Sequence, residues 1–505
     1  MRSRIKRHLW PVLGEPVAVR PGAAGETIEP DVPPLELNGR DYAIFLLRLA
    51  AEIEHGLMVQ YLFAAYSLGG PSVPREQQAR VRGWQDTILA IAKEEMGHLV
   101  TVQNLLTALG GPLQFNREDY PNDNVLYESG FRLQPLTLPS LATYICAESP
   151  EDWETRDAEQ ARQIKREAQL ATGGEVNRVG RLYEELVTVI GDAALVSDST
   201  FAETNAAMQA SWDAWGRGFR RGERGRQGPD PPDDQDPRAE HELVIVPVTS
   251  RETAIGALEQ VGEQGEGSEL PDNEDESHFQ RFLKIYEEMD DLRADEREAL
   301  VRDVAPNPTT HLDGPDVGDP AKPQTASASP GQDAADSAKP ATASAISNPE
   351  ARIWAHLFNV RYRKLLVSLS HAFELAEDRS DLGAPGPRGT LINRSFGEMY
   401  NLRSVAGVLV ALPLDHAKPD DKRAGPPFQM PHTLMLPHDE PDRWRLHRDL
   451  LDASATLLAR IATADGTGAG QDYVAALAQA DRIERGQLEL LIGGAPPGPG
   501  AGPQP

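Results

Sequence analysis

Residues 90–106, AIAKEEMGHLVTVQNLL, form an amphipathic pattern with polar side chains on the face that a helix would bury. Positions three, four and seven apart share one face of a helix, which places Glu95 and His98 on or beside the apolar stripe that includes Leu99. An ionised carboxylate is costly to bury without a charged partner or a metal ion. Glu95 and His98 are therefore the first candidate functional residues.

The segment that precedes this one has the same property. In residues 47–68, LRLAAEIEHGLMVQYLFAAYSL, Glu54 falls on the apolar face with Leu57 and Tyr61, whereas Glu52 points elsewhere. The turn signal GGPSVP then separates two long expected helices, at about 41–68 and 74–109. Two adjacent helices are thus predicted to project Glu54, Glu95 and His98 into one apolar interior.

Inward carboxylates and a histidine in this arrangement are typical of a metal site. A single inward Glu or His is more often a hydrogen-bonded core residue, and Glu-x-x-His alone is common. An inward Glu on one helix combined with Glu-x-x-His on the next is half of the carboxylate-bridged dimetal site of four-helix bundles. Because carboxylate and imidazole ligands suit iron or manganese, we expect two iron ions, with manganese as the alternative.

Composition restricts the partners. The chain has 505 residues and a formal charge of −28, which argues against nucleic acid or an anionic membrane as a partner. Its single cysteine, Cys146, suits a reducing compartment. We find neither a signal-peptide core nor a run of about 18 apolar residues, so we expect a cytoplasmic protein.

The chain is predicted to be mostly α, because helical patterns recur and no run of paired strands stands out. An interrupted third helix is expected at about 154–191, and further helices from Thr249 or Ser250 and from near Ser277. The expected organisation is an irregular segment 1–35, a bundle 36–292 with a flexible insertion 216–242, a disordered linker 304–348, a C-terminal helical block 350–492 and a disordered tail 493–505.

Four motifs resemble a known family: AAEIEHGLMVQYLFAAYSL, IAKEEMGHLVTVQNLLTALGG, EQGEGS and ESHFQRF, in this order. Together they are similar to the ferritin-like domain of the iminophenyl-pyruvate dimer synthase type, found in the violacein and rebeccamycin/staurosporine pathways. The resemblance covers about 38–292 and continues more weakly into the C-terminal block. It implies a ferritin-like four-helix bundle in which Glu54, Glu95 and His98 bind metal and Glu266 and His278 complete the site.

The sequence departs from that pattern at two places. Glu266 and His278 are twelve residues apart instead of forming Glu-x-x-His, so they meet only if the intervening loop folds back. Arg181 follows Gly180 where relatives carry a glutamate. Glu184 is the substitute ligand that we predict for this third helix. Glu175 and Glu185 remain alternatives. Each of these three glutamates can equally be a solvated surface charge.

Neighbouring residues have weaker claims. His55 and Glu94 flank the expected ligands and can either replace them or orient them. Tyr61 and Tyr183 can donate hydrogen bonds to ligating carboxylates, although helix packing explains them equally well.

Two functions follow as hypotheses. In the first, a di-iron oxidoreductase acts on a small molecule, which the resemblance implies to be an amino-acid-derived imine, with a partner biosynthetic enzyme. In the second, the chain is a non-catalytic metal-binding or degenerate ferritin-like scaffold. The intact set of Glu54, Glu95 and His98 favours the first hypothesis, whereas Arg181 favours the second.

Overall fold

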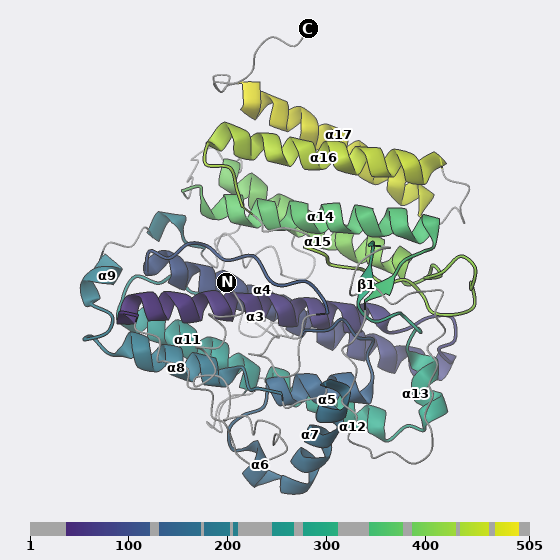
Figure 1. The fold of residues 1–505 in the computed structure, drawn as a ribbon, viewed down its shortest axis with the longest axis horizontal. Coiled ribbons are helices and arrows are strands. Elements are labelled where there is room, and N and C mark those ends of the chain that lie inside the picture. The colour runs from purple at the N-terminus through teal and green to yellow at the C-terminus, as the bar shows by residue number, and fades with distance from the viewer. Residues whose placement is uncertain are drawn as a thin grey trace, which may run out of the picture. The chain divides into compact units, whose positions relative to one another are not determined.

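The computed structural model describes residues 37–121, 131–172, 176–202, 206–210, 245–266, 276–311, 343–376, 386–430, 435–463 and 470–493. These residues are mostly helical, which confirms the predicted fold class (Figure 1). They divide into two compact units. Of the described residues, the first unit contains those up to Asn307 together with 343–344, and the second contains 308–311 and those from Ala345 onwards. The first unit carries the predicted site.

Two long helices, α3 (Gly39–Ser67) and α4 (Gln78–Ala108), form the centre of the first unit. The Asn38 side chain caps α3 by accepting a hydrogen bond from the backbone N–H of Asp41 at 3.0 Å. At the same end of the pair, the Arg40 Nε donates to the carbonyl of Leu109 at 2.8 Å. The start of α3 therefore lies beside the end of α4, and the two helices run antiparallel, as a hairpin requires.

A glycine fixes the end of α4. Gly110 has φ +69°, a conformation that other residues rarely adopt, and its N–H bonds the carbonyl of Thr107 at 3.1 Å. The N–H of Gly111 bonds the carbonyl of Leu106 at 2.8 Å. This pair of bonds is a Schellman motif, which satisfies carbonyls that the helix end leaves open.

Four further helices surround this hairpin and position the site. They are α5 (Leu138–Ala147), α8 (Gly180–Gly191), α11 (Arg251–Glu266) and α12 (His278–Asp290). Helix α8 packs against α3 and α11, and α12 packs against α4, α5 and α11. Ser250 and Ser277 precede α11 and α12 and accept hydrogen bonds from Thr253 and Gln280, as expected for N-caps.

The interrupted third helix of the sequence analysis is three separate helices: α6 (Trp153–Arg156), α7 (Ala158–Thr172) and α8. The pair of glycines after Thr172 lies outside the described residues. The remaining short elements of this unit are η1 (Arg75–Gln77), α9 (Asp198–Ala202), η2 (Ala206–Met208) and α13 (Ala294–Leu300).

The second unit contains α14 (Pro349–Phe373), α15 (Pro387–Leu409), α16 (Glu440–Thr463) and α17 (Gln471–Gly493). Helix α14 packs against α15 and α16, and α16 packs against α17 (Figure 1). Buried Arg361 on α14 joins three of these helices, because its guanidinium donates to Glu398 on α15 and to Asp481 on α17 at 2.6–2.8 Å. Removing one member of such a buried network leaves an uncompensated charge.

The expected linker 304–348 is partly structured. The strands β1 (Pro308–Thr309) and β2 (Ser344–Ala345) pair with each other, and Val304 and Ile346 are buried. Residues 312–342 lie outside the described residues, as do the predicted irregular segment 1–35, the predicted insertion 216–242 and the tail beyond residue 493.

Within the described part of the chain, no helix combines the length and the apolar character that crossing a bilayer requires.

Candidate metal centre

Glu54, Glu95 and His98 meet in the interior between α3 and α4. Each side chain is almost completely buried. The Nδ1 atom of His98 lies 3.3 Å from Glu54 Oε2 and 3.3 Å from Glu95 Oε2. One turn of α4 separates Glu95 from His98, and α3 lies alongside, so the predicted helical periodicity accounts for this meeting. The three residues offer donor atoms within 4.8 Å of one another.

A second group of donors shares Glu95. Glu95, Glu148 and His278 also offer atoms within 4.8 Å of one another. The Nδ1 atom of His278 lies 2.8 Å from Glu95 Oε1 and 3.8 Å from Glu148 Oε2. Both added residues come from helix ends, since Glu148 is the C-cap of α5 and His278 is the first residue of α12. Glu95 thus turns one carboxylate oxygen towards each histidine.

The donor set fits a pair of divalent cations. Glu95 Oε1 and His278 Nδ1 are buried, and within the described residues neither has a hydrogen bond of acceptable geometry although they lie 2.8 Å apart. Buried polar atoms are seldom left without such a partner. Three carboxylates and two imidazoles form a ligand set that suits iron or manganese.

The protonation of the cluster supports the same conclusion. Burial raises the pKa of Glu95 well above its usual value, and the Glu148 carboxylate raises it further. Burial opposes protonation of His278, but the neighbouring carboxylates of Glu95, Glu148 and Glu94 raise its pKa to about 10. Protons therefore compensate the clustered carboxylates when no cation does. Metal ions would displace these protons on binding.

Two tyrosines hold the outer carboxylates. The Tyr183 hydroxyl on α8 donates a short hydrogen bond to Glu54 Oε1. The Tyr61 hydroxyl on α3 donates to Glu148 Oε1 at 2.5 Å. Tyr144 and Phe282 pack against the Tyr61 ring at centroid distances of 4.9 Å and 4.8 Å, which fixes its orientation.

Each histidine also has a partner on its second nitrogen. The Nε2 of His98 donates to Gln264 Oε1 at 2.8 Å, and the Nε2 of His278 donates to Glu94 Oε2 at 2.9 Å. Arg281 donates to both oxygens of Glu94. Burial raises the pKa of Glu94, but His278 and Arg281 outweigh it and lower the pKa to about 2. These acceptors leave Nδ1 of each histidine facing the cluster, as outer partners of metal-bound histidines do.

A cavity of about 20 Å³ adjoins the cluster, and small residues of α8 and α11 form part of its wall. A Cβ atom on Gly180 would come within 1.9 Å of Glu266 Oε1, so a side chain at this position would displace the Glu266 carboxylate. Both carboxylate oxygens of Glu266 lie 3.2 Å from Nη2 of Arg178. Burial raises the pKa of Glu266 to about 7, although Arg178 lowers it.

The structure separates the predicted site residues into two sets. It brings Glu54, Glu95, His98 and His278 together, whereas Glu266 lines the cavity and is paired with Arg178. Their role as ligands stays a prediction.

The third-helix prediction, Glu184, lies outside the cluster. Its side chain is 57% exposed and forms an ion pair with Arg178 at 3.2 Å. The reason is its place on α8: the preceding residue, Tyr183, faces Glu54, and adjacent helical residues point in different directions. Of the alternatives, Glu185 accepts a hydrogen bond from Tyr42 at 3.4 Å, and Glu175 lies outside the described residues.

Sequence reasoning missed Glu148, Gln264 and Arg281. A signal for Glu148 was present, because it follows the buried residues Leu141 and Tyr144 by seven and four positions and so continues their face of α5. Of the two residues expected to flank the site, Glu94 orients His278, whereas burial and Arg117 lower the pKa of fully buried His55.

Comparison with known proteins gives a family and two relatives. Residues 47–287 match the family model Ferritin-like. The chain is 25% identical over 426 residues to dichlorochromopyrrolate synthase of Lentzea aerocolonigenes, a match that covers 78% of this chain and 36% of that protein. It is 29% identical over 154 residues to 2-imino-3-(indol-3-yl)propanoate dimerase of Chromobacterium violaceum, covering 26% of this chain and 15% of that protein. The chain therefore spans only a minor part of the length of either relative.

Among solved structures, a ferritin like protein from Caulobacter vibrioides has a TM-score of 0.38 and 17% identity to this chain, covering 74% of this chain and 98% of its own.

Proposed function

We propose that the buried cluster holds two divalent metal ions, both iron, and that the chain is an oxidoreductase acting on a small molecule; the match of residues 47–287 to the family model Ferritin-like supports this proposal. Manganese is the alternative metal, since it favours the same ligands. The observation that carries the proposal is the pair of donor groups sharing Glu95.

In this proposal Glu54, Glu95 and His98 hold one ion, and Glu95, Glu148 and His278 hold the other. When bound, such a pair of ions exchanges electrons with dioxygen or peroxide, which carboxylates and imidazoles alone cannot do. The protein residues orient the ligands and exclude water. Tyr61 and Tyr183 fix the carboxylates, and Leu57 supplies an apolar wall of the cavity.

The proposed substrate is an amino-acid-derived imine. Support comes from the name of the second relative, which contains 2-imino-3-(indol-3-yl)propanoate. Joining two such molecules by oxidation releases two electrons and two protons, which convert dioxygen to hydrogen peroxide, or hydrogen peroxide to water. Because imines hydrolyse in water, we further propose that a partner biosynthetic enzyme supplies the substrate.

The activity is tested by forming this imine from L-tryptophan with an L-amino-acid oxidase in the presence of the iron-loaded full-length chain. We expect an oxidised product, detected by mass spectrometry, that His98→Ala abolishes. Glu184→Ala is the matched control, because its exposed carboxylate lies outside the cluster. No product with iron-loaded wild-type protein, or equal product with His98→Ala, would contradict the proposal.

One observation favours the alternative of a non-catalytic metal-binding scaffold. The cavity beside the cluster has a volume of about 20 Å³, enough for a water-sized molecule and too small for an aromatic imine. A scaffold would bind metal without forming product, so measuring metal content and product on the same sample separates the two functions.

A further inference from the structure

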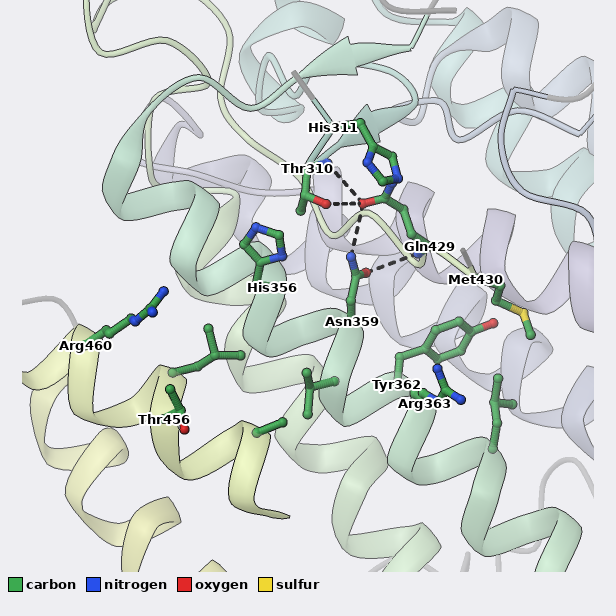
Figure 2. Close-up of a pocket in the computed structure, with 14 residues that line it drawn as sticks. Thr310, His311, His356, Asn359, Tyr362, Arg363, Gln429, Met430, Thr456 and Arg460 are labelled. Atoms are coloured by element: carbon green, nitrogen blue, oxygen red, sulfur yellow. Dashed lines mark hydrogen bonds between the residues drawn. The ribbon is translucent and has the colours of Figure 1, made fainter. Parts of the chain in front are cut away.

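The second unit contains a cavity of about 580 Å³ between α14 and α16 (Figure 2). Residues 310–311 and 429–430 also line it. This volume falls within the range of pockets that bind small molecules. None of the proposed metal ligands lines this cavity, so the following inference is independent of the proposed dimetal function.

Regular helical spacing builds the two long walls. On α14, His356, Asn359, Val360 and Arg363 recur at intervals of three and four residues, which places them on one face. On α16, Ala453, Thr456, Leu457 and Arg460 do the same. Each face has an apolar residue in its middle, Val360 or Leu457, and an arginine three residues further along the helix.

The polar end of the cavity is held by a network of amides and hydroxyls. Gln429 Oε1 accepts hydrogen bonds from the N–H and the hydroxyl of Thr310, at 3.0 Å and 2.8 Å, and from Asn359 Nδ2 at 3.0 Å. Its Nε2 donates to the Thr309 hydroxyl at 2.9 Å. Figure 2 shows this network beside His311. Because these groups bond one another, they form a preorganised wall, and other residues must recognise a ligand.

Those other residues are basic. The cavity is lined by His311, His356, Arg363 and Arg460, and none of its described lining residues is acidic. This is notable in a chain with a formal charge of −28. Burial lowers the pKa of His356, and the charges of Arg352, His311 and Arg460 lower it further, which shows that basic groups gather at this end.

Arg460 is the basic residue of the cavity best placed to bind a ligand. Within the described parts of the chain its guanidinium makes neither a salt bridge nor a hydrogen bond, and the residue is exposed. In Figure 2 it extends from α16 on the side of the cavity that His356 occupies. Arg363 lies next to Tyr362 in the same view, with apolar Leu366 one turn further along α14. A guanidinium at the edge of an apolar cavity is suited to a carboxylate.

We propose that this cavity binds a small organic anion with an apolar ring system. The rings lie against Val360, Leu366 and Leu457, and the carboxylate lies on the side of Arg460 and His356. Arg363 contributes positive potential from the opposite side. Binding needs both the ring system and the carboxylate, since the walls of the cavity provide apolar surface and Arg460 at its edge provides positive charge.

The test uses 2-naphthoate as the probe and ligand-observed NMR titration of the full-length chain. We expect a Kd of about 1 mM or tighter, the range that a ligand of this size reaches. The uncharged 2-naphthamide should bind about fivefold more weakly, because it lacks the charge-assisted bond to Arg460. Inorganic phosphate at the same concentration should not displace the naphthoate.

Matched variants locate the site. Arg460→Gln should weaken naphthoate binding about fivefold, and Arg363→Gln should weaken it less. Arg403→Gln is the control, because this exposed residue of α15 does not line the cavity. Ala453→Phe should block binding by filling the cavity, with the melting temperature confirming that the variant is folded.

Several results would overturn the proposal: no binding of naphthoate at about 5 mM, well above the Kd that its size allows; equal binding by naphthoate and naphthamide; displacement by phosphate; or an Arg460→Gln variant that binds like Arg403→Gln.

Discussion

The Oε1 atom of Glu95 lies 2.8 Å from Nδ1 of His278, and this contact links the middle of α4 to the first residue of α12. The other oxygen of Glu95 lies 3.3 Å from His98 Nδ1. A single carboxylate therefore belongs to both donor groups, whereas Glu54 and Glu148 belong to one each. Removing the shared carboxylate of Glu95 should therefore change the metal content differently from removing the outer carboxylate of Glu54 or Glu148.

Glu148→Gln should reduce bound metal by about half, because it removes a ligand from one group and keeps the shape of the side chain. Glu95→Gln should remove nearly all of it. Elemental analysis of the purified chains measures both effects. Glu151→Gln is the control, since Glu151 is exposed just beyond α5. Full metal content in Glu148→Gln would show that the group containing His278 does not bind metal.

Gln264 should act by orienting His98. Gln264→Leu removes the acceptor of the His98 Nε2–H bond, and loss of such an outer partner weakens metal binding by about tenfold or more. Competition with a chelator measures this affinity. Gln264→Glu retains an acceptor oxygen and should retain most of the affinity. If the Leu and Glu variants lose affinity equally, Gln264 does not act through the hydrogen bond.

Gly180 should be required by the position of Glu266. The three nearest atoms to a Cβ on Gly180 all belong to the Glu266 carboxylate, so Gly180→Ala should lower the free energy of unfolding by about 1–3 kcal/mol. The cost should shrink in a Glu266→Ala background, because the clash is then gone. Chemical denaturation measures both values.

Gly256→Ala is the matched control for that substitution. Gly256 lies in α11, and nothing lies within 4 Å of its added Cβ, so alanine there should stabilise the helix by about 0.5–1 kcal/mol. An equal cost of Gly180→Ala with and without Glu266 would contradict the explanation.

The second unit should become less stable in acid because of a buried histidine pair. His371 Nδ1 lies 3.1 Å from His447 Nε2, and both residues are fully buried. Burial lowers the pKa of His371 to about 3, helped by Arg443, and burial also lowers the pKa of His447 well below 6.5. At pH values between these lowered pKa values and the unfolded value of about 6.5, the unfolded chain binds more protons than the folded chain. The free energy of unfolding therefore falls as pH falls from about 6.5, by about 1.4 kcal/mol per pH unit for each histidine.

The measurement is the thermal midpoint of the full-length chain at pH 7 and pH 5. His447→Leu should show a smaller loss at pH 5 than wild type, because one titrating group is gone. His416→Leu replaces an exposed histidine and should behave like wild type. Identical pH dependence in all three proteins would exclude the histidine pair as the cause.

Helical periodicity predicted the part of the site that lies within long helices. Glu54, Glu95 and His98 stand on regular apolar faces of α3 and α4, so spacing alone identified their direction. The mostly α fold followed from the same periodicity. The resemblance to a known family predicted His278 as a further site residue. No spacing rule connects His278 to Glu95, because the two residues lie on helices far apart in the chain.

The remainder depends on tertiary packing. Glu148 projects from the C-cap of α5, where the helical pattern ends, and its contact with Tyr61 arises only when α5 packs beside α3. The prediction of Glu184 placed a carboxylate where the fold places the Tyr183 hydroxyl, since a step of one residue along α8 turns the side-chain direction by about 100°. Sequence alone does not fix that rotation when both residues are polar.

Metal content per chain tests the central claim most directly. Full-length wild-type protein, expressed with iron and manganese supplied, should contain about two atoms of these metals by elemental analysis, the number expected of a dimetal bundle. Glu95→Ala and His98→Ala should lose metal while keeping the helical content of wild type, and Glu184→Ala should keep its metal. A folded wild-type chain without metal, or a Glu95→Ala variant with full occupancy, would contradict the account.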